Sequence, residues 1–129
     1  MGTLIKSISF KNFYNYYGSY EDNTYTFTEG LNIINADNNM GKSKFYNGFL
    51  WILRDEVYDS DVKKIYPASE SYFKMMSAKA RYERSVLEMG VRIIYENEGI
   101  TYKVTKSVNC SKQGDDWDYR CPRFHSTSL

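Results

Sequence analysis

The chain has 129 residues, of which 42% are hydrophobic and 26% charged, and its formal net charge at pH 7 is +1. This balance is typical of one globular domain, excludes a largely disordered chain, and gives no support to a strongly basic surface for nucleic acid or anionic membrane. No segment approaches the ~18 consecutive apolar residues of a membrane span, so we expect no membrane partner and a cytoplasmic location.

The cysteine and histidine content argues against a structural zinc site. Cys110 and Cys121 are the only cysteines, and His125 is the only histidine, so the chain lacks a four-ligand set. Nothing at the N-terminus looks secretory, and the cytosol is reducing. We therefore expect two free thiols rather than a disulfide between them.

The first third of the chain predicts three strands. Residues 4–10 alternate between apolar and polar side chains, with one polar interruption on the apolar face. An aromatic and polar loop at 14–20 leads to a second short strand at 25–27, and residues 31–35 form a short apolar run suited to a buried strand. We expect the first two strands to pair antiparallel beside the third.

The third predicted strand enters a run with the spacing of a phosphate-binding loop. Its residues are Ala36, Asp37, Asn38, Asn39, Met40, Gly41, Lys42 and Ser43. Backbone N–H groups of such a loop wrap a polyphosphate, provided that the chain can approach it closely. Gly41 would allow the turn, Lys42 would reach the β- and γ-phosphates, and the Ser43 hydroxyl would bind Mg²⁺.

Two positions depart from the strictest form of this loop. Ala36 replaces the first glycine, and Asn39 stands where many such loops have an inner glycine. Asparagine tolerates positive φ well, and alanine adds only one methyl group, so neither change excludes a phosphate site. The alternative is an ordinary glycine-containing turn between a strand and a helix.

The remainder of the chain predicts a helix, a loop, a second helix and a hairpin. Apolar residues at helical spacing follow the phosphate loop, so bound phosphate would lie at a helix N-terminus; these residues are Phe45, Phe49, Ile52, Leu53 and Val57. Residues 55–71 read as a polar loop and 72–84 as a short helix. Clean alternation over 87–95 and 100–108 around a Glu-Asn-Glu-Gly turn predicts a β-hairpin, and residues 109–129 predict an irregular tail. A less favoured reading takes residues 93–96 as the acidic end of a strand that holds Mg²⁺.

The N-terminal pattern resembles a known family. The opening Leu-Ile-Lys-Ser-Ile-Ser-Phe-Lys-Asn-Phe, a tyrosine-glycine pair, and Glu-Gly-Leu-Asn-Ile-Ile before the loop are similar in order and spacing to the N-terminal ATPase lobe of SMC/RecF/SbcC-type ABC ATPases. The hairpin continues the likeness through Gly99, Tyr102, Val104 and Lys106. The resemblance implies an α/β fold over residues 1–108, namely a P-loop NTPase N-terminal lobe with a mixed sheet, antiparallel N-terminal strands and a C-terminal β-hairpin.

The resemblance also implies ligands and partners. It implies ATP and Mg²⁺ as cofactors, with Ser43 as the metal ligand, and work on DNA in repair or genome defence. Lys11 and Asn12 would approach the nucleotide, although a solvated strand end explains them equally well, and Tyr14 stands where the family often has an arginine. The partners would be a C-terminal ATPase lobe or a second ATPase head, with DNA bound through the complete complex.

The sequence carries no signature motif, no acidic strand with a catalytic glutamate, and no heptad run for a coiled coil. We therefore expect ATP binding without the means for hydrolysis, and we assign no catalytic residue. Two other hypotheses stay open. One is a self-sufficient P-loop kinase or GTPase, and the other is a truncated, non-catalytic interaction module.

Overall fold

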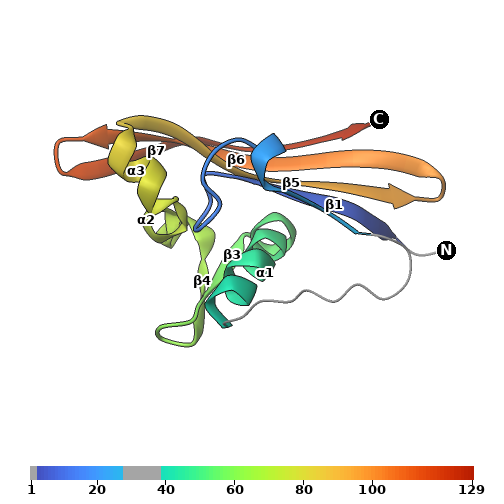
Figure 1. Ribbon diagram of the computed structural model, residues 1–129, viewed down its shortest axis with the longest axis horizontal. Helices are drawn as coiled ribbons and strands as arrows, with labels where there is room; N and C mark the ends of the chain where they lie inside the picture. The colour runs from blue at the N-terminus through green and yellow to red at the C-terminus, as the bar shows by residue number, and fades with distance from the viewer. Residues whose placement is uncertain (1–2, 28–38) are drawn as a thin grey trace.

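A five-stranded antiparallel sheet forms the body of the molecule (Figure 1). The computed structural model describes residues 3–27 and 39–129, and the side chains at positions 39–43 and 121 lie outside that description. The strands lie in the order β2-β1-β5-β6-β7. Their bounds are β1 Leu4–Lys11, β2 Thr24–Thr26, β5 Val86–Asn97, β6 Ile100–Gln113 and β7 Asp116–Ser128.

Two strand pairings agree with the sequence pattern. β1 pairs antiparallel with β2, and the hairpin of β5 and β6 is confirmed over its whole length, from Val86 opposite Ser111 to Asn97 opposite Ile100. Glu98 and Gly99, which form the hairpin turn, both have positive φ. This is the two-residue turn whose twist matches that of the flanking strands.

Helix α1, Asn39–Arg54, covers one face of the sheet (Figure 1). The close approach depends on Gly48, since a Cβ there would lie 2.6 Å from Phe10 Cε1 and 3.2 Å from Ile8 Cδ1. At its C-terminal end, Lys106 Nζ donates to the carbonyl of Trp51, where a cation also suits the helix dipole.

Aromatic rings fill the space between α1 and the sheet. The Phe13 ring stacks on Trp51 with centroids 5.8 Å apart, and Phe10 stacks on Phe13 at 5.6 Å. All three side chains have 0% exposure. Such offset rings add to the hydrophobic gain from burial, so the core is largely an aromatic stack held against the inner face of the sheet.

The segment between α1 and β5 is more structured than the sequence suggested. A second, two-stranded sheet pairs β3, Glu56–Asp59, with β4, Lys64–Pro67, so the expectation of a loop at 55–71 was wrong. Strands of four residues are too short to show a reliable alternation. Single 3₁₀ turns occur at Glu21–Asn23 and Ala68–Glu70.

The predicted helix at 72–84 divides into two, α2 Tyr72–Met75 and α3 Ala78–Glu83. Met76 is extended, and the backbone N–H of Ser77 donates to the Asn12 carbonyl at 2.8 Å. The Ser77 hydroxyl then caps α3 by accepting from the N–H of Ala80. No helix among the described residues is long and apolar enough to cross a membrane.

The expected fold class was wrong. All the strand pairs within residues 3–27 and 39–129 are antiparallel, so this is a mainly antiparallel β-sheet domain and not an α/β P-loop NTPase lobe with a mixed sheet. The mixed sheet was implied by the family resemblance, and the strand predicted at 31–35 lies outside the described residues.

The irregular tail expected at 109–129 is also absent. These residues complete β6 and form β7, joined by a turn in which Gly114 has a φ of 65°. Among the described strands β7 pairs with β6 alone, and its charged and polar side chains hide the apolar alternation by which strands are recognised.

Candidate functional site

Helix α1 begins inside the predicted phosphate loop. Its first residue is Asn39, so the backbones of Gly41, Lys42 and Ser43 belong to its opening turns. The N–H groups at the start of a helix have no partner within the helix, and the dipole there favours an anion. Ala36, Asp37 and Asn38 lie outside the described residues.

Lys11 does not lie beside α1. In β1, Ile8 and Phe10 face the helix, so the alternation directs Lys11 to the opposite face of the sheet. There its Nζ forms an ion pair with Glu88 Oε1 at 2.9 Å and lies 5.8 Å from the Tyr20 ring centroid. Lys11 therefore lies on the face of the sheet away from the described start of α1.

Asn12 is occupied by contacts that hold the fold together. Its side chain is buried, donates to the Glu88 carbonyl at 3.0 Å and accepts from the Gly18 N–H at 3.0 Å. Its φ of 49° is a left-handed conformation that asparagine tolerates well. These bonds fix the turn after β1, and they leave the Asn12 amide little capacity for a ligand.

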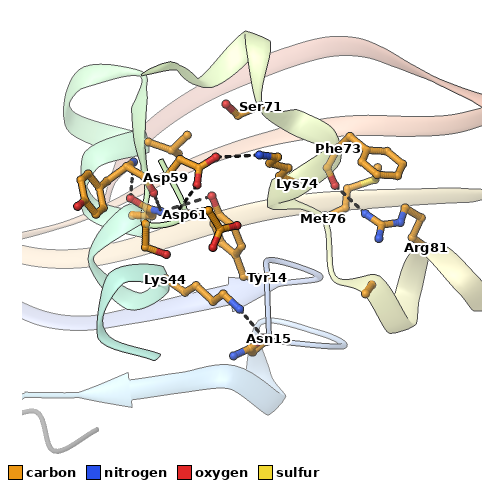
Figure 2. Close-up of a pocket in the computed structure, with 15 residues that line it drawn as sticks. Tyr14, Asn15, Lys44, Asp59, Asp61, Ser71, Phe73, Lys74, Met76 and Arg81 are labelled. Atoms are coloured by element: carbon orange, nitrogen blue, oxygen red, sulfur yellow. Dashed lines mark hydrogen bonds and ion pairs between the residues drawn. The ribbon is translucent and has the colours of Figure 1, made fainter. Parts of the chain in front are cut away.

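A cleft lies beside the N-terminal half of α1 (Figure 2). Its volume is about 320 Å³, and its walls come from α1, the turn after β1, β3 with the loop beyond it, and the α2–α3 segment. The charged residues that line it are Lys44, Asp59, Asp61, Lys74 and Arg81. Sequence reasoning proposed none of these five, because the segments that carry them are distant in the chain and show no motif.

Asn47 holds two walls of this cleft together. It is 1% exposed, its Oδ1 accepts from the Tyr58 N–H at 2.8 Å, and its Nδ2 donates to the Tyr58 carbonyl at 2.9 Å. The same Nδ2 lies 3.3 Å from the Tyr14 hydroxyl. This amide therefore ties α1 to β3 and to the turn after β1, and it gives the cleft a fixed floor.

An ion pair closes one end of the cleft. Lys74 Nζ lies 2.8 Å from Asp59 Oδ2, and Asp59 Oδ1 accepts from the N–H of Asp61 at 2.9 Å. The hydrogen bond from Lys74 is the main cause that lowers the pKa of Asp59, and the same bond raises the pKa of Lys74. Both groups are charged at neutral pH, and each is already engaged by the other.

The two remaining cations of the cleft lack carboxylate partners within the described part of the chain. Lys44 donates to Asn15 Oδ1 at 3.2 Å. Arg81 donates to the Phe73 carbonyl at 2.8 Å and stacks 4.0 Å from the centroid of the Phe73 ring. Figure 2 shows both side chains at the rim of the cleft, where they would attract an anionic ligand.

Tyr14 contributes a half-buried phenol to this cleft. Burial raises the pKa of Tyr14 to about 12, so its phenol stays protonated near neutral pH and cannot serve as a base. Within residues 3–27 and 39–129 no cluster of three histidine, cysteine, aspartate or glutamate side chains could hold a metal ion.

The two cysteines can be compared with the prediction only in part. Cys110 is a free thiol, 0% exposed, and burial raises its pKa to about 12, so it is an inert core residue.

No protein-family model matches the sequence, and none of the curated proteins compared with it is a match. The function is therefore argued from the residues themselves.

Proposed function

We propose that this protein binds the polyphosphate of ATP, together with Mg²⁺, at the N-terminal end of α1. The observation that supports the proposal is the helix start at Asn39, which puts Gly41, Lys42 and Ser43 in the opening turns. Backbone N–H groups and the helix dipole favour phosphate at this position. In this proposal the residues from Ala36 to Met40 wrap the phosphates, Lys42 neutralises their charge, and Ser43 binds the metal.

The proposed role is ATP binding within a larger ATPase that serves DNA repair or genome defence. It rests on the resemblance of residues 3–108 and on the helix start, and not on the sheet, whose antiparallel order differs from the fold expected. A C-terminal ATPase lobe or a second ATPase head would supply the groups that position water and stabilise the transition state, and DNA would bind through that complete complex.

Isothermal titration calorimetry with Mg·ATP tests the nucleotide site. We expect Lys42→Ala to weaken binding by at least about tenfold, equal to ~1.4 kcal/mol, because the point charge on the phosphates is lost. Lys64→Ala is the matched control, since Lys64 is an exposed lysine of β4. Chelation of Mg²⁺ by EDTA is expected to weaken binding to the original protein as well.

Three results would contradict the proposal. If Lys42→Ala and the original protein bind Mg·ATP with equal affinity, Lys42 is not part of the site. If the original protein shows no measurable binding of Mg·ATP, the result favours a non-catalytic interaction module. A phosphate-release assay adds the third test. Turnover near ~1 per second that depends on Lys42 would mean that the chain holds its own catalytic groups, as a kinase or GTPase would.

A further inference from the structure

β7 is an open edge of the main sheet. It is 13 residues long, has β6 as its one partner strand within residues 3–27 and 39–129, and is drawn at the border of the molecule in Figure 1. The unpaired N–H and C=O groups along such an edge can hydrogen-bond to a further strand. A specific partner must match both the spacing of these groups and the side chains beside them.

The hydrogen bonds of β6 show which groups of β7 point outward. The Leu129 N–H donates to the Thr101 carbonyl, so alternate residues from 123 to 129 point toward β6, and Phe124 directs its backbone groups to the open edge. Near the other end, the Lys112 N–H donates to Ser85, and so its partner Trp117 also points outward. Trp117 and Phe124 thus present free N–H and C=O groups to a second strand.

The polar side chains along β7 differ between its two ends. Asp116 and Asp118 lie in the first half, where Arg120 pairs with Asp118, and Arg123 and His125 lie in the second half. All four lie on one face of the sheet, because they pair in register with Gln113, Ser111, Ser107 and Thr105 of β6. The opposite face of the edge carries aromatic rings, among them Trp117 and a Phe124 that is 60% exposed.

We propose that β7 pairs antiparallel with β7 of a second copy of this chain, in the register that places Trp117 opposite Phe124 of the second copy. In this register Asp118 faces Arg123 of the second copy, and Asp116 faces His125. A two-fold axis through the pair repeats each contact. The two five-stranded sheets then join into one.

The self-complementarity of β7 favours a second copy over an unrelated strand. Reversing the strand sets Asp118 against Arg123 and Asp116 against His125, and it sets two outward-pointing aromatic residues opposite each other as a hydrogen-bonded pair. Asp118 already accepts from Arg120 Nε through Oδ2 at 2.6 Å, and its Oδ1 has capacity for a second donor. Pro122 neighbours the inward-pointing Arg123, so its missing N–H falls on the open side.

Sedimentation equilibrium of the full chain without nucleotide tests the proposal, and it is independent of ATP binding. We expect a monomer–dimer equilibrium. Phe124→Pro, which removes the outward N–H and the ring, should weaken the dimer by about tenfold or more. Tyr82→Ser, which removes a 92% exposed ring of α3, is the matched control and should leave the equilibrium unchanged.

A charge exchange gives a second test that does not depend on proline. Asp118→Arg and Arg123→Asp should each weaken the dimer, and the double variant should recover it because opposite charges again face each other across the axis. Circular dichroism confirms that each variant is folded. A chain that stays monomeric up to ~300 μM, or a dimer that neither Phe124→Pro nor the charge reversals weaken, overturns the proposal.

Discussion

The two faces of the main sheet are stabilised in different ways. The inner face is buried beneath α1 and carries apolar side chains, namely Ile8, Phe10, Met89, Val91, Ile93, Val104 and Val108. The outer face is polar, and its side chains bond sideways to their neighbours, as Ser9 does to Thr24 at 2.9 Å and Arg92 to Thr105 at 3.2 Å. The inner face therefore gains its stability from desolvation, and the outer face gains less, from hydrogen bonds that compete with water.

One aromatic ring on the outer face makes the contrast clearer. Tyr20 is 8% exposed, and its ring lies over Gly90 with the Arg92 guanidinium 4.1 Å from the ring centroid. Its hydroxyl has no hydrogen-bond partner among the described residues, and burial raises its pKa to about 12. The Tyr20 ring can pack on the outer face only because Gly90 has no side chain. The stability of the inner face depends instead on how completely its buried side chains fill the space beneath α1.

The largest effect should come from the inner face. We expect Trp51→Ala to lower the free energy of unfolding by about 3–5 kcal/mol, because it opens a cavity beside Phe13 and Tyr72. Urea unfolding measures the change. Trp51→Phe should cost far less, since it keeps a ring in place and removes an indole N–H that has no partner within the described residues. A loss below ~1 kcal/mol for Trp51→Ala would show that the aromatic stack is not the core.

A smaller loss is expected from Gly90→Ala on the outer face. The added methyl group would overlap the Tyr20 hydroxyl and lie 3.2 Å from the Lys106 carbonyl oxygen, so the ring must shift, at a cost of about 1–3 kcal/mol. Tyr20→Phe alone should change stability by less than ~1 kcal/mol, because the deleted hydroxyl has no partner in the described chain.

The double variant decides whether this contact is the cause. Gly90→Ala with Tyr20→Phe should cost less than the two single changes added together, since the overlapping oxygen is gone. Thermal and urea unfolding of the four proteins complete the cycle. Strict additivity would assign the loss at Gly90 to the backbone and not to Tyr20.

The sequence predicted the parts of the fold that local pattern controls. The hairpin of β5 and β6 alternates over many residues and turns at Glu98-Gly99, so both periodicity and turn chemistry agreed. β7 was missed because residues such as Asp118 and Arg120 are polar on a strand with one neighbour. The sheet order was beyond reach, since strand pairing is set by contacts between distant segments and not by local propensity.

The candidate site divides in the same way. The helix after the motif followed from the apolar spacing beyond it, but the structure begins that helix at Asn39, inside the run that the sequence predicted as loop. The cleft beside it combines Tyr14, Asn47 and Asp59 from three separate segments, and Asn47 bonds to Tyr14 and to the backbone of Tyr58, the neighbour of Asp59. These residues come close together only when the core packs, so no spacing pattern in the sequence could predict that they line one cleft.

The smallest effect should come from Lys11, and it tests where the nucleotide lies. Lys11 and Glu88 form an ion pair whose side chains are 32% and 34% exposed, and so Lys11→Met should cost less than ~1 kcal/mol of stability. Methionine keeps the unbranched stem of lysine without its charge. Because Lys11 lies on the face of the sheet opposite α1, we expect its loss to leave the affinity for Mg·ATP within about twofold, in contrast to the tenfold loss for Lys42→Ala. The same titration calorimetry measures both variants. A loss at Lys11 equal to the loss at Lys42 would mean that the nucleotide contacts the end of β1, as the family resemblance implied, and that the outer face takes part in binding.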